Sequence, residues 1–195
     1  MYTPSYRVRG RGVPILSKPE IDTIGENFVR DFQPSVLTNP APVDIESFVE
    51  NYLGMTPDYQ LLSHNGYFSY DPNQTCMFDM AMTPMIQCRM DAGCKKGDRK
   101  LWTDHDWMEW QANYFSSAIL MPKCAVQLVA NKYPRNSLME NLVNRARLVS
   151  DVSNTFDVST EAAVIRLKDM GYIPSDDQTS YSAFTALMDF ASVAI

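Results

Sequence analysis

The sequence has no apolar run of the about 20 residues that a membrane-spanning helix needs. Its first 14 residues are polar and include no apolar core of the kind that a signal peptide carries. Positive charge is also scarce, because 17 lysines and arginines face 23 acidic residues and the net charge is -6. We therefore expect a cytoplasmic protein with no membrane partner, for which nucleic acid is an unlikely ligand.

The sequence also lacks a Cys-x-x-Cys pair, which argues against a zinc ribbon or a redox motif. In the cytoplasm its cysteines should be reduced. Cys88 and Cys94 are close enough in sequence to share a metal, but incidental thiols are the better interpretation. The four cysteines are Cys76, Cys88, Cys94 and Cys124.

Most of the chain shows helical spacing of apolar residues, bounded by capping residues and by glycine or proline. Ser17 and Glu20 form a capping-box pattern, and Ser137 and Glu140 form a second. We predict helices that begin near residues 17, 44, 104, 122, 137 and 159 and end near residues 34, 54, 122, 133, 149 and 171.

The β content should be small. Residues 59–62 and 66–70 are predicted as short strands, whereas residues 71–103 show no sustained period. We expect residues 67–103 to be the least stable part of the molecule. The three arginines at positions 7, 9 and 11 should lie in a solvated tail, and residues 174–180 should be mobile.

Glu109 is the first candidate functional residue. It lies on a predicted helix with two apolar stripes, which suggests that the helix is largely buried. A buried carboxylate is costly unless it is paired, protonated or bound to a metal. The alternative is a half-exposed carboxylate stabilised by the nearby helix N-terminus.

Residues 106–122, which read Asp-Trp-Met-Glu-Trp-Gln-Ala-Asn-Tyr-Phe-Ser-Ser-Ala-Ile-Leu-Met-Pro, resemble a signature of the ImmA/IrrE family of zinc metallopeptidases. Phe156-Asp-Val-Ser159 and Arg166-Leu167 before Gly171 resemble the family's C-terminal segment. The resemblance extends over about residues 15–173. It implies a zinc cofactor in the family, with Glu109 as the third zinc ligand.

The same resemblance leaves a gap. The family's His-Glu-x-x-His helix supplies two zinc-binding histidines and the glutamate that polarises water. This sequence has only His64 and His105, and neither begins that motif. The segment between Gly66 and Trp107 is too short for the zinc helix and the missing strands. We interpret this as an internal loss, either genuine or an artefact of the gene prediction.

The resulting prediction is a mainly α protein with a small β component, an α+β fold. The resemblance adds a truncated zincin-like scaffold followed by C-terminal helices. Residues 15–133 would form a degenerate metallopeptidase domain, residues 134–173 a C-terminal helical segment, and residues 174–195 a tail or terminal helix. We expect an inactive metallo-endopeptidase homologue that binds no zinc and has a regulatory protein or repressor as its partner.

Three alternatives stay open. The zinc helix is missing only from this sequence record, in which case the natural protein is an active zinc endopeptidase that cleaves a repressor-type protein. A second possibility is a rebuilt metal site from His64, His105, Glu109 and a cysteine. A third is a DNA-binding or adaptor module, with residues 137–171 as a helix-turn-helix, although that segment is slightly acidic.

Overall fold

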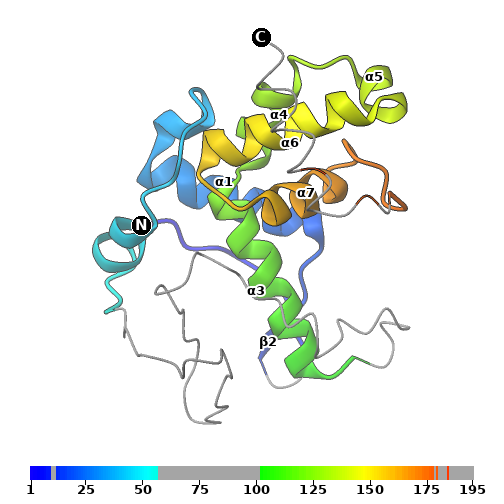
Figure 1. Cartoon of the computed structure of the whole chain (residues 1–195). Coiled ribbons are helices and arrows are strands. Elements are labelled where there is room, and N and C mark those ends of the chain that lie inside the picture. Colours follow the sequence, from blue (N-terminus) through cyan, green and yellow to red (C-terminus); the bar gives the residue numbers. More distant parts are fainter. Residues whose placement is uncertain (10–11, 57–101, 178, 180–183, 185–195) are drawn as a thin grey trace, which may run out of the picture.

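The computed structural model describes residues 1–9, 12–56, 102–177, 179 and 184 (Figure 1). The predicted strands at residues 59–70 and nearly all of the weak region at 67–103 lie outside these ranges. Within them, no helix is both long enough and apolar enough to cross a membrane.

The described chain is mainly helical, as predicted, and its β structure is one short hairpin. Antiparallel strands β1 and β2 pair Val8 with Pro14 and Arg9 with Val13. Arg7 of the predicted solvated tail is exposed, whereas Val13, next to the turn of this hairpin, is buried. The elements are β1 (Val8–Arg9), β2 (Val13–Pro14), α1 (Lys18–Phe32), η1 (Pro34–Leu37), α2 (Ile45–Ser47), η2 (Phe48–Tyr52), α3 (Asp104–Leu120), α4 (Lys123–Ala130), α5 (Arg135–Glu140), α6 (Leu142–Phe156) and α7 (Thr160–Asp169).

Helix α1 begins and ends where its sequence predicts. The Ser17 hydroxyl accepts the backbone N–H of Glu20, and the Glu20 carboxylate accepts the N–H of Ser17, so the capping box is complete. The helix ends at Phe32, two residues before Pro34. Asp44 likewise caps α2 by accepting the N–H of Ser47.

Helices α3 and α4 are separated at Pro122. Thr103 and Asp106 close a second capping box at the start of α3. Pro122 has no N–H to continue the α3 hydrogen bonds, and it becomes the residue before α4. Helix α4 ends at Ala130, a little before the predicted boundary near residue 133.

The predicted capping box at Ser137 and Glu140 is wrong. Helix α5 already begins at Arg135 after Pro134, so Ser137 lies inside it. Asn141 adopts an extended conformation that separates α5 from α6, and its side chain accepts the N–H of Val143 at 2.9 Å. The side chain that caps a helix here is therefore Asn141, four residues later in the chain than the predicted cap Ser137.

The residues that follow α7 in the chain remain in contact with the C-terminal helices. Ser159 caps α7 as predicted, and Gly171 with φ of 73° turns the chain after it. The expected mobile tail is wrong at Asp177, whose carboxylate lies 3.0 Å from Nε of Arg145 and whose backbone oxygen accepts Nζ of Lys168. Phe184 is fully buried.

Three clusters of buried apolar residues organise the described chain. One combines residues of α4, α5, α6 and α7 with Ile173 and Phe184. The other two lie along the contact between α1 and α3; one includes Val29 and Ile119, and the other includes Ile21. In Figure 1, α3 runs beside α1 and reaches from β2 to α4, so it connects the hairpin with the C-terminal helices.

Candidate peptidase-like site on helix α3

Glu109 lies in the N-terminal half of α3 and its side chain is exposed. The expectation that this helix is largely buried is therefore wrong for this half. Met108 is 47% exposed and Ala112 is also exposed, whereas Tyr114, Ala118 and Ile119 further along are buried. The apolar stripes of the sequence predicted the buried half correctly, but they could not tell which side chains of the helix are exposed.

Three indole rings lie beside this part of α3. Trp107 and Trp110 contact each other edge to face with 5.8 Å between ring centroids, and Trp102 lies 4.9 Å from Trp107. The cavity next to them has a volume of about 330 Å³ and is also lined by Ile15 and Leu16. Two of its charged groups are already engaged, because Lys18 pairs with an acid on α7 and Glu20 belongs to the α1 capping box; Arg7 also lines this cavity.

The described residues do not fit a zinc ion. They contain no group of three or more histidine, cysteine or acidic side chains that could hold a metal. His64, Cys76, Cys88 and Cys94 lie outside the described residues, as does the side chain of His105. Among the residues that the resemblance assigns to zinc, only Glu109 can therefore be placed, and the rebuilt metal site remains a prediction.

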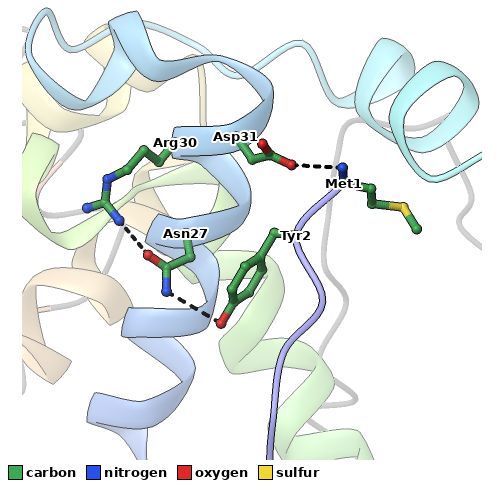
Figure 2. Close-up of a pocket in the computed structure, with 5 residues that line it drawn as sticks. All are labelled: Met1, Tyr2, Asn27, Arg30 and Asp31. Atoms are coloured by element: carbon green, nitrogen blue, oxygen red, sulfur yellow. Dashed lines mark hydrogen bonds and ion pairs between the residues drawn. The ribbon is translucent and has the colours of Figure 1, made fainter.

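A second cavity lies between the N-terminal segment and α1 (Figure 2). It has a volume of about 400 Å³, and its polar groups contact one another. Asn27 lies between Arg30 and the Tyr2 hydroxyl, and Asp31 pairs with the amino group of Met1 at 3.3 Å. The polar groups that line this cavity thus serve contacts within the protein.

Among the described residues, the most strongly buried polar cluster lies where α1, α3 and α7 meet. The sequence did not reveal it. Arg166 of α7 is fully buried, and its Nη1 lies 2.8 Å from Oδ1 of Asp22 on α1. Its Nε donates to the carbonyl oxygen of Met121 at 3.1 Å. Tyr114 of α3 donates its hydroxyl to Oδ2 of Asp22 at 3.2 Å, so three helices meet at this cluster.

The environment of Tyr114 favours its neutral form. Burial raises the pKa of Tyr114 to about 12, chiefly because a phenolate would lose its hydration there. The nearby Arg166 guanidinium lowers that pKa, and the carboxylate of Asp22 raises it, so the two charges partly offset each other. Because the paired side chains of Asp22 and Arg166 are buried between helices, the cluster has the character of a structural interlock.

The buried arginine also bears on the DNA-binding alternative. Helices α6 and α7 are joined by residues 157–159, which is the length of turn that a helix-turn-helix uses. However, Arg166 is turned inward toward Asp22, and Arg145 is paired with Asp177. Two of the cations within residues 137–171 are therefore unavailable for phosphate contacts, which weakens this alternative.

A periodicity argument could have found Arg166. It lies three residues after Ala163 and next to Leu167, both of which are fully buried, so it shares their helix face. A cation on the buried face of a helix requires a counter-charge. The sequence does not say which of 23 acidic residues supplies it, because Asp22 is distant along the chain.

Comparison with known families supports the resemblance seen in the sequence. The family model described as Peptidase_M78, IrrE N-terminal-like domain, matches residues 94–168. The match includes α3 to α6 and nearly all of α7. No curated protein and no solved structure matches the chain.

The matched region defines a metallopeptidase-like class of domain, whose zincin-like scaffold is implied by the family match alone. Residues 94–168 of this chain match that family model, which supports an assignment to the ImmA/IrrE family. Both Glu109 and Arg166 lie within the matched region, so the exposed carboxylate and the buried interlock are parts of the same family segment.

Proposed function

We propose that this chain is a metallopeptidase-like regulatory protein that binds a protein partner, such as a repressor, without cleaving it. One observation carries the proposal. The family match includes the helix that bears Glu109, yet the 195 residues contain only two histidines and no His-Glu-x-x-His. A zinc peptidase needs three protein ligands and a water-polarising base, and one exposed glutamate supplies neither set.

The family's usual partners suggest the kind of ligand. A scaffold that has lost its metal can still present the surface that once received a polypeptide, and binding then takes the place of cleavage. The net charge of -6 and the inward-turned arginines of α6 and α7 favour a protein partner over DNA.

Metal content tests the proposal directly. Protein purified and dialysed without chelator should hold far less than one zinc per chain by elemental analysis. The variant Glu109→Ala should show the same low content, since removal of one exposed carboxylate from an absent site changes nothing. About one zinc per chain that falls in Glu109→Ala would refute the proposal and support a rebuilt site.

Partner binding can be separated from metal chemistry. Any repressor-type protein that binds the chain should bind with the same affinity in the presence of a strong chelator, and it should remain uncleaved. Chelator-sensitive cleavage would contradict the proposal. Resequencing of the locus completes the test, because a restored His-Glu-x-x-His segment would make the active endopeptidase the correct interpretation.

A further inference from the structure

Two ion pairs join α1 to α7. The inner pair is Asp22 with Arg166, which is fully buried on the arginine side and 9% exposed on the aspartate side. The outer pair is Lys18 with Asp169, whose side chains are 35% and 26% exposed. We propose that these pairs form a charge-patterned interlock, which fixes the register and direction of α7 against α1 more than it adds net stability.

The order of the charges carries the inference. Along α1 a cation at position 18 is followed by an anion at position 22, and along α7 Arg166 is followed by Asp169. The contacts run in opposite directions, because Lys18 meets the later residue of α7 and Asp22 meets the earlier one. The spacing is about 6 Å on α1 and about 4.5 Å on α7, from a rise of about 1.5 Å per residue.

Displaced registers bring like charges together. A shift of α7 by one turn, about 5.4 Å, toward the start of α1 would place Arg166 beside Lys18. A shift of one turn the other way would place Asp169 beside Asp22. Either shift leaves buried charges without their counter-charges, which is a large penalty relative to the marginal stability of a domain.

Apolar packing alone would not enforce this choice. The buried side chains of α7 around Arg166 are Ala163, Val164 and Leu167, and apolar contact is not directional. Arg166, in contrast, has three fixed partners: the Asp22 carboxylate, the Met121 carbonyl and the face of the Tyr114 ring, 5.5 Å from its guanidinium carbon. These polar contacts provide the direction that the apolar surface lacks.

Tyr114 links both pairs to α3. The Lys18 ammonium lies 5.3 Å from the centroid of its ring, and Arg166 also lies over that ring. Both cations therefore make cation–π contacts with the same aromatic ring. The position of α7 is thereby coupled to α3, the helix that carries Glu109.

The outer pair has a further unusual feature. Lys18 is the first residue of α1 and Asp169 is the last residue of α7. Each charge has the sign that its own helix dipole disfavours, since anions are favoured at helix starts and cations at helix ends. Local helix energetics thus oppose both residues, and their benefit comes from the contact between the two helices.

This conflict provides a sharp test. Lys18→Asp should favour α1 locally and yet bring two anions together, so α7 should open more easily. We expect hydrogen–deuterium exchange of residues 160–169 to become about tenfold faster or more, with residues 142–156 as an internal reference. The swap Lys18→Asp with Asp169→Lys should restore slow exchange. Unchanged exchange in Lys18→Asp, or no recovery in the swap, would overturn the proposal.

The inner pair is tested by complete removal of its polar groups. Arg166→Met alone leaves Asp22 buried without a counter-charge and should shift unfolding to lower urea. The triple change Asp22→Leu, Tyr114→Phe and Arg166→Met should recover most of that loss, while α7 exchange stays fast. A triple variant with slow α7 exchange would overturn the specificity role, as would one that remains as unstable as the single variant. Lys132→Asp, at an exposed lysine outside the interlock, is the matched surface control and should leave α7 unchanged.

Discussion

Gly25 of α1 faces Ala118 of α3 so closely that a Cβ built on the glycine would lie 3.0 Å from the Cβ of Ala118 and 3.2 Å from its backbone carbonyl. Gly25 and Ala118 are both buried where these helices cross. Because Gly25 has no side chain, α1 can approach α3, the helix that carries Glu109, this closely.

Gly25→Ala should therefore destabilise the protein despite the better helix propensity of alanine. The propensity gain is up to about 1 kcal/mol, whereas overpacking against backbone atoms costs about 1–3 kcal/mol. We expect a net loss of about 1–2 kcal/mol in the free energy of unfolding, measured by urea titration.

A double-mutant cycle provides the control for this contact. Ala118→Gly should recover part of the loss in the Gly25→Ala background, because the nearest atom has been removed. The same change at exposed Ala112 should give no recovery. Full additivity at Ala118 would show that the two helices separate freely and that the close approach is unimportant.

Glu26 connects α1 to the start of α4. Its Oε1 accepts the backbone N–H of Cys124 at 2.8 Å, and Pro122, which precedes α4, provides no side-chain cap. Glu26→Ala should thus cost about 0.5–2 kcal/mol of unfolding free energy, the usual value of a helix cap. Glu26→Gln keeps an acceptor oxygen and should cost less, while Glu46→Ala at an exposed site serves as the control.

The same carboxylate affects the Cys124 thiol. Burial is the main cause of its raised pKa, and the negative charge of Glu26 raises it further. Glu26→Gln removes only the charge, so the thiol should ionise at lower pH and react faster with iodoacetamide near pH 8. Peptide mass spectrometry separates Cys124 from the other cysteines, and a slower reaction would contradict this assignment.

The raised pKa of Tyr114 predicts that the protein loses stability at alkaline pH. Its folded pKa is raised to about 12 from 10.0, so its contribution is fully present below the unfolded pKa and is lost as pH rises through the folded one. Stability should fall between about pH 10 and pH 12, and Tyr114→Phe should reduce this pH dependence. Tyr133→Phe is a necessary companion, because burial also raises the pKa of Tyr133. An unchanged pH dependence in both variants would show that other groups dominate.

Glu109→Ala should change the free energy of unfolding by less than about 0.5 kcal/mol, because the side chain is exposed. Asp106→Ala on the same helix should cost about 1 kcal/mol, since Asp106 completes the capping box with Thr103. A loss of more than about 2 kcal/mol at Glu109 would indicate a strong partner for its carboxylate.

The sequence alone determined where most of the observed helices begin and end. Ser17, Asp44 and Ser159 cap the helices they were predicted to cap, because a side-chain oxygen next to a helix start acts within one turn. Gly171 and Pro122 mark helix boundaries for equally local reasons. Gly171 adopts a positive φ, and Pro122 has no backbone N–H. The resemblance to the ImmA/IrrE family also came from short, contiguous motifs.

Tertiary structure alone decided which faces of those helices are covered. Three examples are the exposure of Glu109, the close contact of Gly25 with Ala118 and the pairing of Asp22 with Arg166. Each depends on whether residues that are distant along the chain lie together in the fold. Periodicity can place Arg166 on a buried face, but it cannot select Asp22 as its counter-charge. That selection depends on how α7 is positioned against α1 and α3, and so it arises only when the helices pack together.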